Sequence, residues 1–243
     1  ATEVLVNFSG SMSRRVAGAL NNGYTNQRAM DSACGGEWWR PLAEQVRDAQ
    51  LHNQPGNTGG RGRKISYEPL VHTIAAEYAR RVAEATGMYA KVIPVYRKLR
   101  QQPLYHLVFL TRAQYGLWVF ANAAARARKQ WLEHLAEMER REDQARPQGV
   151  LLEGGWEQEF ISRRETRQAH AVLVANLTGL LQRHSGFKLV QQTEAVFGEM
   201  YGVAGEDAVE RAVKELQELG QARVIRRAGK EHRIREWFVR RPR

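Results

Sequence analysis

The C-terminal residues 191–243 constrain the fold most tightly, because each short segment there has a distinct pattern. Residues 193–201 predict a short helix, and Gly202 and Gly205 predict the turn that follows it. Residues 207–219 place apolar side chains at helical spacing, which indicates an amphipathic helix that ends at Gly220. The apolar positions of that helix are Val209, Ala212, Val213, Leu216 and Leu219.

Two strands are predicted after this helix, at 222–227 and 234–240, with a turn at 228–230. The order helix, turn, helix and two-stranded hairpin is that of a winged helix. The hairpin is strongly basic, so we expect it to contact the phosphates of a nucleic acid. The predicted nucleic-acid-binding residues are Arg223, Arg226, Arg227, Lys230, Arg233 and Arg235, and Arg240, Arg241 and Arg243 follow them.

The helix before the hairpin carries acidic residues, which disfavours its entry into the major groove of DNA. These residues are Glu206, Asp207, Glu210, Glu215 and Glu218. Carboxylates suit a helix N-terminus but repel phosphates. Two interpretations stay open: the module grips a nucleic-acid backbone without reading its bases, or it serves packing and protein contact.

The charge of the whole chain also favours a polyanionic partner. The 243 residues carry a formal net charge of +11, with a sequence pI of about 10.1. Such a field attracts nucleic acid, although a merely basic surface, rich in Arg rather than Lys, gives the same total. No run approaches the roughly 20 apolar residues of a membrane span, so we expect no membrane partner.

A single cysteine, Cys34, excludes an internal disulfide framework and a multi-cysteine zinc site. It fits a cytoplasmic protein, and no base stands near it in the sequence, so we expect an idle thiol. We find no phosphate-binding loop, nucleophile elbow or zinc spacing, and we expect no metal. Trp38 and Trp39 are expected in a core or an interface rather than as a platform for bases.

The first part of the chain predicts an α/β domain. Residues 3–8 form an apolar run that is typical of a central parallel strand buried on both faces. Strands at 89–97 and 104–112 are joined by a short connection and are expected to form an antiparallel pair. Helices are expected at 11–21, 37–51, 67–85 and 114–141, and a loop at 52–64.

A turn-forming segment at 146–149 suggests a domain boundary. We therefore expect three parts: an α/β domain over 1–146, a connecting helical segment over 147–187 and the winged-helix-like module over 188–243. The connecting segment contains a predicted helix at 156–184.

Several segments together resemble the three-Cys-motif partner proteins, a bacterial family with a methyltransferase-like Rossmann domain and a winged-helix-like tail. Residues 103–118 carry the most specific part of this resemblance, which covers most of the chain. The segments are Val4-Leu-Val-Asn-Phe8 with Arg14 and Arg15, Trp38-Trp39, Val92-Ile-Pro-Val95, Pro103-Leu-Tyr-His-Leu-Val-Phe-Leu-Thr-Arg112 and Gly116-Leu-Trp118.

The resemblance implies a Rossmann sheet in which the last two strands form an antiparallel addition, and it implies a partner protein with a three-cysteine motif, of the radical S-adenosylmethionine type. It also implies S-adenosylmethionine as cofactor, bound at a glycine turn. That turn is not in this sequence, so residues 1–146 are expected to be the C-terminal part of a partial Rossmann sheet. Asn7-Phe8-Ser9-Gly10 lacks the prolines of amino-methylating enzymes, which argues against base N-methylation.

The candidate catalytic residue is Asn7, which is expected at the tip of a strand where open α/β sheets bind ligands; a turn-forming asparagine is the alternative. Candidate substrate-binding residues are Arg14, Arg15, Arg61 and Arg63, each of which also fits an exposed position. Three functions follow: a methyltransferase-like protein acting on nucleic acid, a non-catalytic accessory factor that binds nucleic acid or protein, or a winged-helix transcription regulator.

Overall fold

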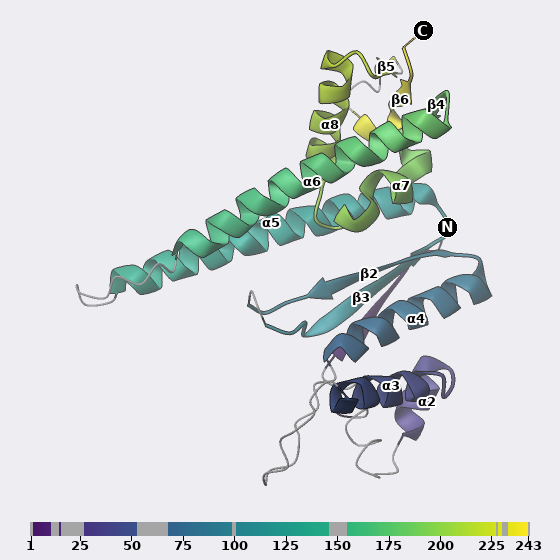
Figure 1. Ribbon diagram of the computed structural model, residues 1–243, viewed down its shortest axis with the longest axis vertical. Coiled ribbons are helices and arrows are strands. Elements are labelled where there is room, and N and C mark those ends of the chain that lie inside the picture. The colour runs from purple at the N-terminus through teal and green to yellow at the C-terminus, as the bar shows by residue number, and fades with distance from the viewer. Residues whose placement is uncertain are drawn as a thin grey trace. The chain divides into compact units, whose positions relative to one another are not determined.

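The fold is mixed α/β, with two small antiparallel three-stranded sheets (Figure 1). The computed structural model describes residues 2–10, 15, 27–52, 68–98, 101–145, 155–226, 228–229 and 233–242. Its contacts divide the chain into two compact units, unit 1 (1–112) and unit 2 (113–243). Each unit is described by itself.

The sheet of unit 1 has a central strand between two neighbours that run the opposite way. The order is β1 (Val4–Ser9), β3 (Tyr105–Thr111) and β2 (Tyr89–Val95), and both outer strands pair antiparallel with β3. The antiparallel pair predicted at 89–97 and 104–112 is therefore confirmed. Because β1 and β2 are each antiparallel to β3, they run parallel to one another.

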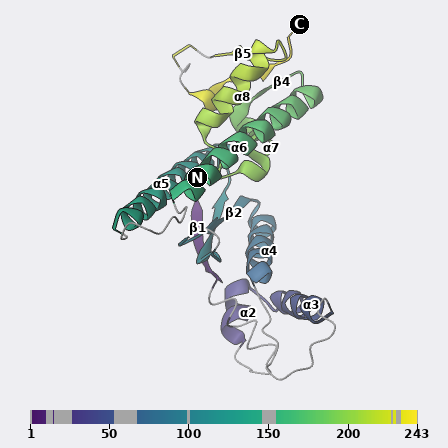
Figure 2. The same ribbon diagram turned by 60° about the vertical axis from the view of Figure 1, so that its left-hand side comes forward.

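Helix α4 (Glu68–Thr86) covers one face of this sheet, and helices α2 (Arg28–Cys34) and α3 (Trp39–His52) contribute residues to the same buried cluster. Helix α4 packs on the sheet and α3 packs on α4 (Figures 1 and 2). Leu70 and Ile74 of α4 are fully buried in the same cluster as Val108 of β3. The predicted helices at 37–51 and 67–85 are confirmed. The predicted helix at 11–21 and loop at 52–64 lie almost wholly outside the described residues.

Strand β1 corrects one prediction. It was expected to be a parallel strand buried on both faces, but among the described residues it pairs only with β3 and is exposed at its start. Leu5 is 55% exposed, whereas Phe8 is buried against the helices. Side chains alternate along a strand, and the helices cover one face only, so an apolar run here is half exposed.

Unit 2 begins with two long helices that lie side by side, α5 (Gln114–Ala145) and α6 (Gly155–Arg183) (Figure 1). After α6 the chain forms β4 (Gly186–Lys188), α7 (Thr193–Phe197), α8 (Glu206–Glu218) and β5 (Arg223–Ile225), with short 3-10 helices at Leu189–Gln192, Gly198–Met200 and Ile234–Glu236. Strand β6 (Phe238–Arg240) lies in the middle of a sheet of order β4-β6-β5, with both pairs antiparallel.

The core of unit 2 lies between α6, α8 and the small sheet. Leu173 and Leu177 of α6 pack in one buried cluster with Val209 and Val213 of α8, and Trp237 before β6 is 2% exposed. The amphipathic helix predicted at 207–219 is confirmed. Its apolar stripe is the surface that α6 covers, which explains why the pattern is so regular.

Unit 2 differs from the predictions in three places. Strand β4 was not predicted, and the return strand expected at 234–240 starts with a 3-10 turn over Ile234–Glu236. That turn buries Ile234 and Trp237 in the core. The predicted boundaries at 146 and 187 also differ from the division at 112, because α5 and α6 pack with the elements that follow them.

Gly198 allows a direct test of the packing between α7 and α6. Its φ is +51 and its ψ is −129, and a Cβ there would lie 2.8 Å from Asn176 Nδ2, which donates a hydrogen bond to Val196 O. We expect Gly198→Ala to lower the free energy of unfolding by about 2 kcal/mol or more, measured by urea denaturation. Gly220→Ala is the control: its φ is +67 but no atom lies within 4 Å, so only about 1 kcal/mol is expected. Equal losses would contradict this view of the α7–α6 contact.

Candidate nucleic-acid interface

Three arginines of the hairpin between β5 and β6 are exposed: Arg223, Arg226 and Arg233. None of them forms a salt bridge within the part of the chain that the structure describes. The guanidinium of Arg226 lies over the ring of Trp237, 4.5 Å from its centroid. Such stacking holds the cation in place without neutralising it, so it stays available to an anion. Arg227 and Lys230, also predicted here, lie outside the described residues.

Arg235 lies in a different environment from the other hairpin arginines. Its Nη1 is 3.2 Å from Glu206 Oε1, and its guanidinium lies 5.2 Å from the ring centroid of Tyr115. The side chain is only 21% exposed. Its positive charge is thus opposed by a carboxylate of the same unit. The sequence alone does not show that Arg235 is neutralised and Arg233 is not, because Arg235 and Glu206 lie 29 positions apart.

Glu206 connects three parts of unit 2. Its Oε1 accepts a 2.6 Å hydrogen bond from Nε1 of Trp118, a fully buried residue of α5. Its backbone N–H donates to Asn122 Oδ1 at 3.1 Å, so α5 also holds the first residue of α8. The same carboxylate pairs with Arg235 in the connection between β5 and β6. The position of the hairpin therefore depends on an acidic residue that the sequence suggested only as a repulsive charge.

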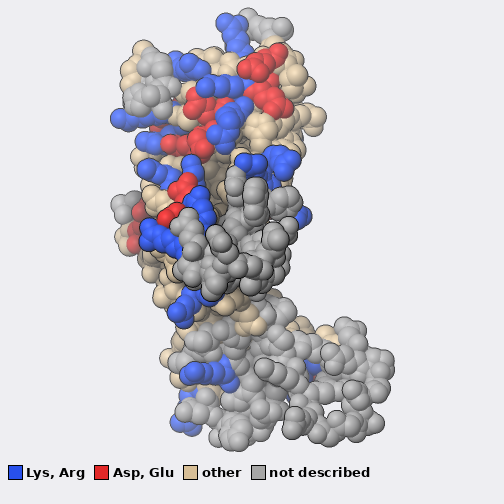
Figure 3. Space-filling view, turned by 90° about the vertical axis from the view of Figure 1, so that its left-hand side faces the viewer, with Lys and Arg blue, Asp and Glu red and all other residues tan. Residues whose placement is uncertain are grey.

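Three further acidic residues of α8 have basic partners in unit 2. Asp207 pairs with Arg211 at 3.1 Å, Glu210 pairs with Lys214 at 2.8 Å, and Glu215 bonds His170 of α6. Figure 3 shows one face of the molecule, on which Lys and Arg interleave with Asp and Glu. The outer surface of α8 thus carries mixed charge, and it offers no cluster of free cations to a groove.

Arg241, which follows the hairpin, has a structural role. Its Nε and Nη2 donate hydrogen bonds to the carbonyls of Leu181 and Gln182 at the end of α6, the second at 2.7 Å. The last carbonyls of a helix lack partners within the helix, and a cation suits the negative end of its dipole. Not every arginine of this basic tail is therefore available to a nucleic acid.

The candidate residues of unit 1 do not gather into one site among the described residues. Asn7 is exposed in the middle of β1, opposite Leu107, rather than at the tip of a parallel strand as expected. Arg15 is exposed. Arg14, Arg61 and Arg63 lie outside the described residues. The position of Asn7 corrects the prediction, because β1 continues in register to Ser9.

A pair of histidines was missed from the sequence. His72 Nδ1 of α4 lies 3.4 Å from Nε2 of His106 on β3, and the ring centroids are 5.4 Å apart. His106 is 1% exposed, whereas His72 is exposed. Two imidazoles this close share one hydrogen bond, in which one ring donates and the other accepts. The pair arises where α4 crosses the sheet, and residues 34 positions apart give no local signal.

Cys34 is buried, and burial raises the pKa of its thiol to about 11, with a further contribution from the Asp31 carboxylate. A thiol with such a pKa is not ionised at neutral pH and is a poor nucleophile. The buried position fits the expected idle thiol, whose lack of reactivity stays a prediction. Trp39 is fully buried and donates a hydrogen bond to Asp31, so its predicted place in a core is confirmed.

Comparisons with known proteins identify no relative: no family model, no curated protein and no solved structure matches the chain. Among the described residues, no group of three or more His, Cys, Asp or Glu side chains is placed to hold a metal ion. None of the helices in those parts of the chain is long and apolar enough to cross a membrane.

The linking role of Glu206 leads to a stability prediction. Glu206→Ala leaves the buried Nε1–H of Trp118 without its acceptor, so we expect the free energy of unfolding to fall by about 2 kcal/mol in urea denaturation. Glu210→Ala serves as the control, because it removes only an exposed pair with Lys214 and costs less than about 1 kcal/mol. A loss from Glu206→Ala no larger than the control loss would refute this role.

Proposed function

We propose that residues 155–243 of unit 2 form a winged-helix-like module that docks on the backbone of a nucleic acid without reading its bases. The exposed, unneutralised arginines of the β5–β6 hairpin carry this proposal. The topology supports it: the elements run α6, β4, α7, α8, β5, β6, and the sheet order is β4-β6-β5. The hairpin would then be the wing.

Charge distribution supports backbone contact over base contact. Arg223, Arg226 and Arg233 are exposed on the hairpin, whereas Asp207 and Glu210 of α8 are paired with neighbouring cations. Phosphate contacts supply affinity and salt dependence but carry no sequence information. The surplus charge of +11 adds a long-range attraction for any polyanion.

The test is a charge reversal in the hairpin. We expect Arg226→Glu with Arg233→Glu to weaken binding of a short fluorescein-labelled duplex and to flatten the plot of log affinity against log salt by about 2, since each phosphate contact contributes roughly 0.9. Fluorescence anisotropy over a salt series measures both quantities. An RNA duplex and a single strand of matched sequence show which nucleic acid binds best.

A matched control reverses two exposed arginines on α6 instead. Arg164→Glu with Arg167→Glu changes the net charge by the same amount and should leave the salt slope nearly unchanged. If both double variants lose the same affinity, the hairpin is not the contact surface. A strong preference for one duplex sequence would contradict backbone docking and favour a transcription regulator.

A second candidate function is a methyltransferase-like role for unit 1, in the manner of the three-Cys-motif partner proteins. The strand arrangement favours it: β1 and β2 run parallel and enclose the antiparallel β3, which agrees with an antiparallel addition to a parallel sheet. S-adenosylmethionine would then be the cofactor and a protein with a three-cysteine motif the partner. Unit 2 would bring nucleic acid to that assembly.

Calorimetric titration of S-adenosylmethionine into the full protein, together with any residues that precede Ala1, tests this role. We expect a saturable isotherm, with ATP as the control for unspecific attraction of an adenosine compound to a basic protein. A flat isotherm, or equal heats for the two compounds, would contradict the methyltransferase-like role and leave unit 1 as part of a non-catalytic accessory factor.

A further inference from the structure

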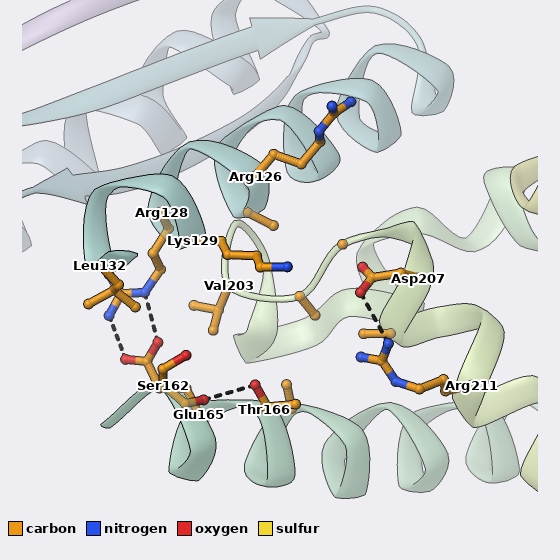
Figure 4. A pocket seen from close by; sticks show the side chains of 15 residues that line it. Arg126, Arg128, Lys129, Leu132, Ser162, Glu165, Thr166, Val203, Asp207 and Arg211 are labelled. Atoms are coloured by element: carbon orange, nitrogen blue, oxygen red, sulfur yellow. Dashed lines mark hydrogen bonds and ion pairs between the residues drawn. The ribbon is translucent and has the colours of Figure 1, made fainter. Parts of the chain in front are cut away.

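Unit 2 contains a cavity that the proposed wing does not use. It has a volume of about 310 Å³ and lies between α5, α6 and the turn that leads into α8 (Figure 4). Its size is at the lower end of the range for pockets that bind small molecules. Its lining is unusually rich in cations, with Arg126, Arg128, Lys129 and Arg211 against the two carboxylates Glu165 and Asp207.

Two ion pairs account for part of this charge. Arg128 makes a bidentate ion pair with Glu165 of α6, in which Nε lies 3.0 Å from Oε2 and Nη2 lies 2.5 Å from Oε1. Nη1 of Arg211 lies 3.1 Å from Oδ2 of Asp207. Figure 4 shows both pairs at the wall of the cavity. Four cations and two carboxylates leave a surplus of two positive charges.

Lys129 is the cation placed to meet a ligand. Its ammonium group points into the cavity, whereas Arg126 extends away from the other lining side chains (Figure 4). No described residue forms an ion pair or a hydrogen bond with Lys129. Ser162 of α6 also lines the cavity and brings a hydroxyl group to it.

The turn before α8 closes one side of the cavity. A Cβ on Gly205 would lie 2.9 Å from Asp207 Oδ1 and 3.0 Å from Asn122 Oδ1, so only glycine lets this wall approach so closely. The amides at the start of α8 are mostly occupied: that of Glu206 donates to Asn122, and that of Ala208 donates to Gly205 O. Side-chain cations, rather than the helix end, therefore supply the attraction.

We propose that this cavity binds the phosphate group of a small phosphomonoester, of the size of a mononucleotide. A phosphomonoester carries a charge of about −1.5 to −2 at neutral pH and offers three acceptor oxygens. Lys129 donates to one of these oxygens, and the hydroxyl of Ser162 supplies a second donor at the same cavity.

The test uses adenosine 5′-monophosphate and adenosine as probes in calorimetric titrations of the whole chain. We expect the monophosphate to bind, adenosine not to bind, and inorganic phosphate to compete. Lys129→Met should weaken binding of the monophosphate about 10-fold or more, because it removes a charged hydrogen bond. Lys98→Met, an exposed lysine of unit 1, removes the same charge and should leave the affinity unchanged.

A second arm separates two sources of the phosphate group. If the ligand is the end of a nucleic-acid strand, a 5′-phosphorylated oligonucleotide binds more tightly than the unphosphorylated one, and Lys129→Met abolishes the difference. If it is a free metabolite, the two oligonucleotides bind alike and only the mononucleotide responds to Lys129→Met. Either result supports the cavity as a phosphate site.

Equal binding of adenosine and its monophosphate, or no binding of either with no gain from a 5′-phosphate, would overturn the proposal. The wing variant Arg226→Glu with Arg233→Glu provides an independent check. It should retain the affinity for the mononucleotide, so failure of the wing as a docking surface and failure of the cavity as a phosphate site give different results.

Discussion

The buried bond between Trp118 and Glu206 is the contact on which the arrangement of unit 2 depends. One carboxylate holds the indole of α5, begins α8 and pairs with Arg235 in the connection between β5 and β6. A partly buried carboxylate is costly unless its oxygens are satisfied, and here an N–H donor and a guanidinium both contribute. The orientation of the basic hairpin relative to α8 follows from this shared acceptor.

The chain combines two ways of using positive charge. Arg241 caps carbonyls, Arg128 crosses from α5 to α6, and Arg235 supports the hairpin, so these cations stabilise the fold. Arg226 and Lys129, in contrast, form no ion pair with any described residue, and they face solvent and a cavity respectively. The net charge of +11 does not by itself show where a polyanion would bind. The location of the unneutralised cations indicates that surface.

Local sequence patterns predicted helices and strands correctly where one face of the element is buried and the other is exposed. The stripe of Val209, Val213 and Leu216 predicted α8, and the short link between β2 and β3 predicted their pairing. Strand β4 was missed because three residues give no periodicity. The half-exposed β1, the His72–His106 pair and the partners of Glu206 were also missed, since they depend on contacts between segments far apart in the chain.

Cys34 has a consequence for experiments on the two units. It is the only cysteine of the sequence, it is 6% exposed, and it lies in the core of unit 1. A thiol reagent can reach it only when α2 separates from α3 and α4, and its raised pKa suppresses attack through the closed state. The alkylation rate therefore reports how often the buried cluster around Cys34 opens.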